Sequence, residues 1–337
     1  ELNDQTVLVS KLVQRKLRPA LTKAGIPILE YKVLNKNQRG QMLAYFQESV
    51  EPILTPLAVD ISHPFPFISN LGLNLAIEVR EKKKKRNRFV RIKVPANRPR
   101  WVPLPGGSGF VPLEQVIAAN LGKLFPKAIK LVCYFFRVTR AAKDDPWEQI
   151  ALGNPDVDTA HGFIVSMVTH ELKARKFAGV VRLEVSANMP KKMRSWLAEQ
   201  LKADIDDVED AQGLLALSDL LIFPVKNRPD LCDPPHTPVT HPRLWGIDAE
   251  DPDQMFAEIR KSEIMLHHPY HSFDTSVLSF LQCAAVDPKV LAIKLTIYRT
   301  SSDSPIIQAL QRATRNGKQV SVLVEITARF DEAPNIA

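Results

Sequence analysis

Two arginines follow two predicted strands near the end of the sequence. Residues 290–298 and 319–326 are almost entirely apolar or β-branched, and they lead into Arg299 and Arg329, respectively. A helical pattern over 304–316 separates them, which predicts parallel strands joined by a crossover helix. Ligands of open α/β sheets bind outside the carboxyl ends of such strands. Because neighbouring strands lie about 4.8 Å apart, the two guanidinium groups could converge on one anion.

The chemistry favoured by this arrangement is phosphate binding. The planar guanidinium fork matches phosphate oxygens, and the start of the intervening helix offers free N–H groups. On composition alone an alternative stays open, in which Arg299 and Arg329 form structural ion pairs with Asp303 and Asp331. Lys294 is a charge inside an apolar strand, and it could either reach solvent at an edge or face the site.

Other residue combinations give weaker indications of chemistry. His267, His268 and His271 resemble a metal cluster, but adjacent residues on a strand point to opposite faces, so we predict no shared metal. The three cysteines are widely spaced, which argues against a disulfide framework and a cysteine-based zinc site. The sequence contains no P-loop, HExxH or glycine-rich nucleotide motif, and no nucleophile can be named from spacing.

The positive charge of the chain is concentrated in one stretch. The net charge is +8, and residues 81–100 contain ten Lys or Arg and a single Glu. Such a stretch attracts polyanions, although an ordinary solvated hairpin turn is the alternative. It lacks interleaved aromatic residues over 82–88, so base stacking is not indicated. The side chains predicted to attract polyanions are Lys82, Lys83, Lys84, Lys85, Arg86 and Arg88.

The elements that position these residues fall into three parts. Two amphipathic helices are predicted first, then a mixed α+β region, then a regular strand–helix alternation whose apolar strands suggest a sheet with helices on both faces. The predicted helices cover 3–24, 38–50, 112–124, 158–177, 190–202, 273–286 and 304–316, and the predicted strands cover 71–79, 89–94, 130–138, 180–185, 263–267, 290–298 and 319–326. We therefore expect an α+β and α/β multidomain protein.

Length and composition agree with this organisation. The 337 residues suffice for about two domains, and 45% apolar with 24% charged residues is typical of globular proteins. No apolar run reaches the roughly 18 residues that a membrane span needs. The sequence begins with Glu1 and has no signal-peptide pattern, so we expect part of a longer, cytoplasmic protein.

Long motifs around the two arginines strongly resemble the polyphosphate kinase family. The best matches include Ile264 to Asp274, which contains the three histidines, and Ile297 to Ser304, which contains Arg299. The resemblance extends over essentially the whole chain. The further matching stretches are 287–294, 317–320 and 328–336, and the weaker ones are 65–71, 136–140, 181–185 and 213–220.

The resemblance implies a domain layout and a reaction. Residues 1–50 would be the end of a helical N-terminal domain, 51–255 a head domain that dimerises, and 256–337 the first part of a phospholipase D-like catalytic domain with parallel strands. Members of the family transfer the γ-phosphate of ATP reversibly to inorganic polyphosphate through a phosphohistidine, with Mg²⁺. Arg299 and Arg329 match family Mg²⁺ positions. Because a guanidinium has no lone pair for a cation, we expect them, with Lys294, to hold phosphate oxygens that in turn ligate Mg²⁺.

The resemblance also sets expectations for partners and activity. The phosphohistidine lies in a His-x-Lys setting that would follow Ala337, so we expect no catalytic residue here and an inactive isolated chain. The expected partners are ATP or ADP, inorganic polyphosphate and further copies of the chain, as a homodimer or tetramer formed through the head domain. Specific nucleic-acid binding is not expected, and peripheral membrane association is allowed. The alternative is a non-catalytic polyanion-binding module that uses the basic stretch 82–100.

Overall fold

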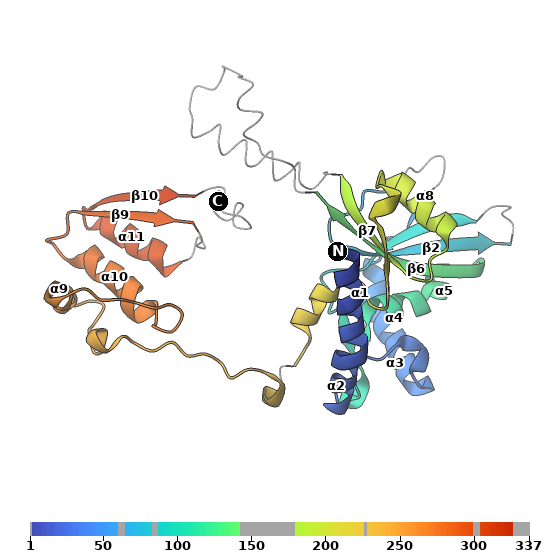
Figure 1. Cartoon of the computed structure of the whole chain (residues 1–337), viewed down its shortest axis with the longest axis horizontal. Helices are drawn as coiled ribbons and strands as arrows, with labels where there is room; N and C mark the ends of the chain where they lie inside the picture. Colours follow the sequence, from blue (N-terminus) through green and yellow to red (C-terminus); the bar gives the residue numbers. More distant parts are fainter. Residues whose placement is uncertain are drawn as a thin grey trace, which may run out of the picture. The chain divides into compact units, whose positions relative to one another are not determined.

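The computed structural model describes two compact units, and each is treated separately below (Figure 1). The first unit is drawn from residues 1–144 and 173–225, and the second from 145–172 and 226–337. The predicted helix 158–177 lies outside the described residues. The described residues are 2–59, 65–82, 87–141, 179–225, 228–298 and 304–325.

The first unit begins with the two predicted helices. Helix α1 (Leu2–Leu12) continues through a π-helical turn (Val13–Leu17) into α2 (Arg18–Lys23), which confirms the helix expected over 3–24. Helix α3 (Lys36–Tyr45) then runs into a second π-helical turn (Phe46–Val50). The Asn35 side chain accepts a hydrogen bond from the Gln38 N–H and the Gln38 side chain accepts one from the Asn35 N–H, so a capping box sets where α3 begins.

A six-stranded sheet forms the centre of the first unit. Its strand order is β1-β3-β2-β6-β7-β8, and all neighbours are antiparallel except the β7–β8 pair. The predicted hairpin is confirmed, because β2 and β3 pair with Ala76 opposite Arg91. The strands are β1 (Leu57–Val59), β2 (Leu73–Glu81), β3 (Arg88–Lys93), β6 (Ala128–Arg140), β7 (Val180–Ser186) and β8 (Val208–Ala211).

Helices cover both faces of this sheet (Figure 1). One face packs against α3 and α4 (Leu113–Ala119), where Phe46 and Ile117 are fully buried. The other face packs against α8 (Lys191–Leu201) through Leu197. The remaining regular elements are α5 (Leu121–Leu124), the hairpin of β4 (Trp101–Pro103) and β5 (Phe110–Pro112), and 3₁₀ turns at Tyr31–Val33, Glu51–Ile53, Pro105–Gly107, Ile205–Asp207 and Leu217–Ile222.

The second unit contains the predicted strand–helix alternation. Strand β9 (Ala292–Ile297) and strand β10 (Gln319–Val324) pair in parallel and are joined by α11 (Pro305–Arg315). Before them lie α9 (Pro252–Lys261) and α10 (Ser279–Val286), the latter preceded by a π-helical turn at Asp274–Leu278. Two 3₁₀ turns occur at Pro229–Leu231 and Pro242–Leu244.

One expectation for the second unit was wrong, and another, that helices cover both faces of the sheet, stays a prediction. Residues 263–267 form an irregular segment instead of a strand, since side chains and a local turn satisfy its backbone rather than a neighbouring strand. In addition, the described helices α10 and α11 pack on one face of the β9–β10 pair only (Figure 1). Ile293 and Ile297 point to that face and are buried, whereas Lys294 and Ser321 lie exposed on the other face.

Among the described helices, none combines the length and apolar character that crossing a membrane requires. The predicted domain limits at residues 50 and 255 remain predictions.

Candidate functional site at the carboxyl ends of β9 and β10

The structure places the two predicted strands side by side and ends them at the same level. Their last paired residues are Ile297 in β9 and Val324 in β10. Arg299 follows Ile297 by two residues and Arg329 follows Val324 by five, so both start from the same edge of the sheet. At about 3.5 Å per residue, a fully extended chain sets an upper limit of about 7 Å for Arg299 and about 17 Å for Arg329 on the distance from the Cα atom to the strand end.

Arg299 and Arg329 themselves lie outside the described residues. Their convergence on one anion therefore stays a prediction, as does the alternative in which they form ion pairs with Asp303 and Asp331. What the structure supplies is the parallel, in-register pair of strands on which that prediction depends.

The N-terminus of α11 lies at the same edge. The helix begins after Ser304, whose hydroxyl accepts a hydrogen bond from the Ile306 N–H at 3.3 Å, and Pro305 occupies its first turn. Because α11 connects two parallel strands, it runs opposite to them and its N-terminus faces the carboxyl end of β9. The positive end of the helix dipole therefore adds to the attraction for an anion at this edge.

Lys294 occupies the middle of β9, not its end. It pairs in register with Ser321 and is exposed on the face opposite the helices. No acidic side chain within the described ranges pairs with it. Its exposure is compatible with both alternatives for its environment, so a role in phosphate binding remains a prediction.

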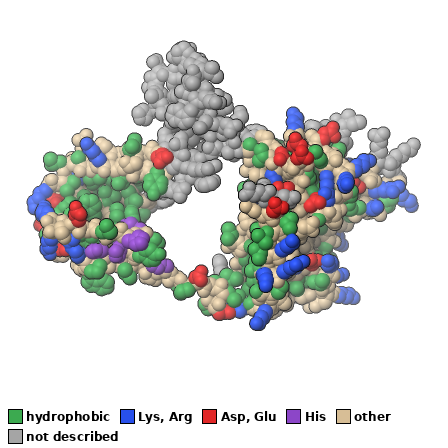
Figure 2. Space-filling view, viewed as in Figure 1, with side chains coloured by type: hydrophobic (Ala, Val, Ile, Leu, Met, Phe, Trp, Pro, Cys, Tyr) green, Lys and Arg blue, Asp and Glu red, His purple; other side chains and the backbone are tan. Residues whose placement is uncertain are grey.

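The three motif histidines hold a loop together. The His267 N–H donates to Nδ1 of His271 at 2.9 Å, and Nδ1 of His268 lies 2.9 Å from the His271 carbonyl oxygen. The ring of His241 packs on that of His271 at 5.0 Å, and Figure 2 shows the histidines gathered in one part of the second unit. Across the described part of the chain, no three His, Cys, Asp or Glu side chains are placed to hold a metal ion.

The described basic residues of the stretch 81–100 lie in different environments. Lys82 is exposed at the end of β2, and Arg88 forms an ion pair with Glu81 at 3.4 Å, whereas Lys83, Lys84, Lys85 and Arg86 lie outside the described residues. Arg91 and Arg100, farther along, are each only 7% exposed. A count of charges along the sequence could not separate these environments.

Arg100 is the residue that the sequence analysis missed most clearly. Its guanidinium group forms a bidentate ion pair with buried Glu114, at 2.7 and 3.3 Å, and a further ion pair with Asp219 at 2.9 Å. It also donates to the carbonyl oxygens of Leu215 and Ala216. Burial by itself would lower the pKa of Arg100, but the two carboxylates raise it above the ordinary value.

Comparisons with known proteins agree with the fold. Two family models match, "Polyphosphate kinase middle domain" over residues 37–223 and "Polyphosphate kinase C-terminal domain 1" over residues 254–337. A polyphosphate kinase from Aphanizomenon baltica is 43% identical over 346 residues, covering 96% of this chain and 87% of that protein. One from Mycobacterium avium is 44% identical over 331 residues, covering 95% of this chain and 44% of that protein.

A solved structure shows the same fold. The crystal structure of polyphosphate kinase from Porphyromonas gingivalis aligns with a TM-score of 0.77 at 24% sequence identity, over 98% of this chain and 46% of that one. The chain thus spans about half the length of the mycobacterial relative and of the solved protein. Because one family model alone matches more than half of the residues, the chain belongs to the polyphosphate kinase family.

Proposed function

We propose that the protein carrying this sequence is a polyphosphate kinase, an enzyme that transfers the γ-phosphate of ATP reversibly to inorganic polyphosphate. Membership of the family supports the substrates and the reaction. The observation that carries the assignment of a site is the parallel β9–β10 pair, whose last residues, Ile297 and Val324, lie opposite each other. Such an edge is where α/β sheets bind phosphorylated ligands.

In this proposal the side chains at the strand ends bind and orient phosphate. Arg299 and Arg329 contribute guanidinium forks that hold oxygens of the transferring group, and the α11 N-terminus adds backbone N–H groups. Fixed positive charge at the oxygens on which negative charge accumulates lowers the barrier to phosphoryl transfer. Lys294 adds positive charge on the open face of the sheet.

The residues at hand do not form a Mg²⁺ ligand set of their own. Mg²⁺ prefers oxygen ligands, whereas the two family positions are arginines. No carboxylate cluster suited to a metal is present among the residues whose positions are given. Mg²⁺ would accordingly enter with the substrate, bound to phosphate oxygens that the arginines hold.

The wider family properties belong to the same proposal. They are a phospholipase D-like completion of the catalytic domain, assembly as a dimer or tetramer through the head domain, a cytoplasmic location and peripheral contact with a membrane. The exposed outer face of β9 and β10 is consistent with further protein packing there.

The test compares three arginines in the enzyme that carries this sequence. Arg299→Ala and Arg329→Ala should each lower kcat for ATP-dependent polyphosphate synthesis about 10²- to 10³-fold, the usual effect of removing a preorganised charge. Arg315→Ala is the matched control, since Arg315 is exposed at the opposite end of α11. If both strand-end variants fold normally and stay within threefold of the parent rate, the arginines are structural and the site assignment is wrong.

A further inference from the structure

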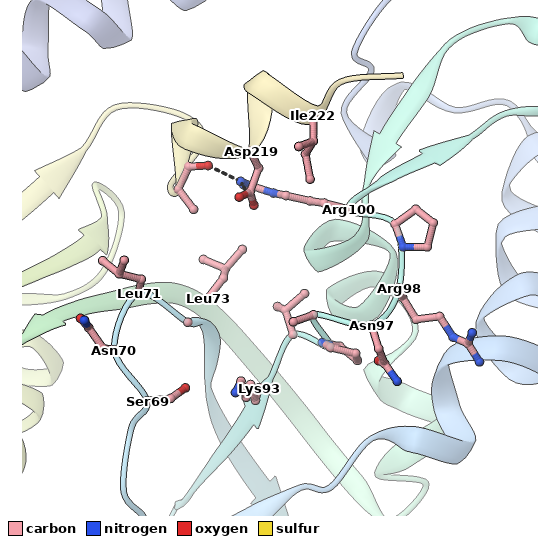
Figure 3. A pocket seen from close by; sticks show the side chains of 16 residues that line it. Ser69, Asn70, Leu71, Leu73, Lys93, Asn97, Arg98, Arg100, Asp219 and Ile222 are labelled. Atoms are coloured by element: carbon pink, nitrogen blue, oxygen red, sulfur yellow. Dashed lines mark hydrogen bonds and ion pairs between the residues drawn. The ribbon is translucent and has the colours of Figure 1, made fainter. Parts of the chain in front are cut away.

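A cavity of about 700 Å³ opens in the first unit, far from β9 and β10 in sequence (Figure 3). It lies between the loop before β2, the segment after β3 and the 3₁₀ turn Leu217–Ile222. Its volume falls in the range of small-molecule sites. None of its lining residues is aromatic, so it offers no platform for a nucleobase.

The cavity carries unbalanced positive charge. Lys93 and Arg98 line it, and neither forms an ion pair with a carboxylate within the described ranges; Arg98 donates only to the Ser49 carbonyl oxygen, at 2.9 Å. The one acidic residue in the lining, Asp219, already forms an ion pair with Arg100. Lys93 therefore lines the cavity without a compensating anion, whereas Figure 3 shows the Arg98 side chain directed away from the centre of the cavity.

The floor of the cavity has a polar group without a partner. Oγ of Ser69 is buried and makes no hydrogen bond. A Cβ at Gly72 would lie 2.8 Å from this oxygen and 3.6 Å from Cε of Lys93. The absence of a side chain at Gly72 thus leaves the hydroxyl and the lysine stem next to each other, and Figure 3 shows Ser69 and Lys93 along one rim. A buried hydroxyl without a partner is costly unless a ligand satisfies it.

A buried cation, Arg91, is connected to the loop that lines the cavity. Arg91 is 7% exposed, and its Nε donates to Oδ1 of Asn74 at 2.8 Å. Nδ2 of Asn74 in turn donates to the Gly72 carbonyl oxygen at 2.7 Å, which ties Arg91 to the loop. Burial lowers the pKa of Arg91, and no carboxylate offsets it, but an arginine side chain remains charged in proteins. Arg91 therefore adds positive potential to the cavity while it positions the loop.

We propose that this cavity binds a short segment of condensed phosphate, with Lys93 as the ionic contact and the Ser69 hydroxyl as a hydrogen-bond donor. The choice of condensed phosphate among anions rests on the proposed function. Because no aromatic residue lines the cavity, the lining favours inorganic polyphosphate over a nucleotide. The volume of the cavity is larger than one phosphate group requires. The first unit would then hold the polymer at a place separate from the strand-end site.

The test is calorimetric titration of the full 337-residue chain with inorganic tripolyphosphate and, separately, with ATP. Lys93→Met keeps the aliphatic stem and removes the charge, and it should weaken tripolyphosphate binding about tenfold, the value of one charge-assisted contact. Lys130→Met is the matched control, because Lys130 is exposed on β6 of the same sheet and does not line the cavity. It should leave the affinity unchanged.

A second variant tests the geometry instead of the charge. Gly72→Ala introduces the methyl group that would displace the Ser69 hydroxyl, and it should weaken tripolyphosphate binding without lowering the thermal unfolding midpoint by more than a few degrees. Equal losses for Lys93→Met and Lys130→Met, or no binding of tripolyphosphate at all, would overturn the proposal. ATP binding tighter than tripolyphosphate would also overturn it, in favour of a nucleotide site.

The outcome is independent of the strand-end arginines. Arg299→Ala in the same titration should leave the Lys93-dependent binding intact. If Arg299→Ala and Arg329→Ala do not affect turnover while Lys93→Met weakens binding, the assignment of the strand-end site is wrong and the cavity proposal is supported. If turnover depends on the arginines but Lys93→Met behaves like its control, the cavity proposal is wrong and the proposed function is supported.

Discussion

Replacement of Arg100 by alanine removes the charge that connects three parts of the first unit. The guanidinium group lies between Glu114 of α4 and Asp219 of the Leu217–Ile222 turn, and it donates to the carbonyl oxygens of Leu215 and Ala216. Except for Glu114, all of these partners lie more than 100 residues from Arg100 in the sequence. Loss of the side chain would leave the Glu114 carboxylate buried without a cation.

The expected loss of unfolding free energy follows from the burial of the Arg100–Glu114 ion pair. The side chains of Arg100 and Glu114 are only 7% and 4% exposed, so water cannot replace the lost partner, and breaking such a pair costs about 3–5 kcal/mol. The Asp219 contact adds little, since its side chain is 37% exposed and is rehydrated when the arginine is removed. Two buried carbonyl oxygens also lose a charged donor, which adds about 1–3 kcal/mol. We expect a loss of unfolding free energy of at least about 4 kcal/mol.

The assay is urea denaturation of the 337-residue chain, followed by tryptophan fluorescence because Trp101 lies next to Arg100. Arg80→Ala is the control, since Arg80 is exposed on β2, and it should change the midpoint little. The double variant Arg100→Met with Glu114→Leu should recover most of the loss, because it leaves no buried charge unpaired. A loss below 1 kcal/mol for Arg100→Ala would refute the reasoning.

Two further predictions concern buried groups in both units. Burial raises the pKa of Cys133 to about 12, and burial together with nearby carboxylates raises the pKa of Cys283 to about 11. At pH 8 a thiol reagent should therefore modify exposed Cys232 rapidly, and the other two cysteines only after denaturation. Rapid labelling of all three in the folded chain would contradict this. Lys318→Met should lower the free energy of unfolding by about 1–3 kcal/mol, because the buried ammonium group donates to two backbone carbonyls that would lose their partner. Urea denaturation measures this loss, and an unchanged midpoint would show that water replaces the ammonium group.

Regular periodicity accounts for what the sequence predicted well. The long helices and the β9–α11–β10 unit repeat apolar residues at the matching period, and the β2–β3 hairpin, which is buried on both faces, shows two apolar runs of strand length. The alternation in β9, with Ile293 and Ile297 inward and Lys294 outward, already distinguished two faces.

Short and irregular elements could not be predicted from the spacing of apolar residues. Strands β1, β4, β5 and β8 have three or four residues, too few to show a period, and their positions depend on partners distant in sequence. The segment 263–267 looked like a strand because it is apolar, but the backbone N–H and carbonyl of His267 are bound by His271, four residues later, in a turn. The apolar pattern of the segment did not reveal this turn.

The two candidate sites also differ in whether the sequence could predict them. The shared edge of β9 and β10 could be predicted because strand order follows from chain connectivity. The cavity of the first unit could not, since its walls come from residues 69–73, 93–100 and 216–222, which only the fold brings together. Gly72 and Ser69 matter there through a distance that no spacing rule encodes.

Charge along the sequence is a poor guide to where anions bind. Within residues 81–100, Arg88 and Arg100 have carboxylate partners, and those partners cancel most of the field that each guanidinium group would present. Lys93 lacks such a partner in the part of the chain that the structure describes, and it lines a concave surface, where low-dielectric walls concentrate the field. A cavity with an uncompensated cation should therefore attract a condensed phosphate more strongly than an exposed turn with a larger number of lysines, each screened by water and salt.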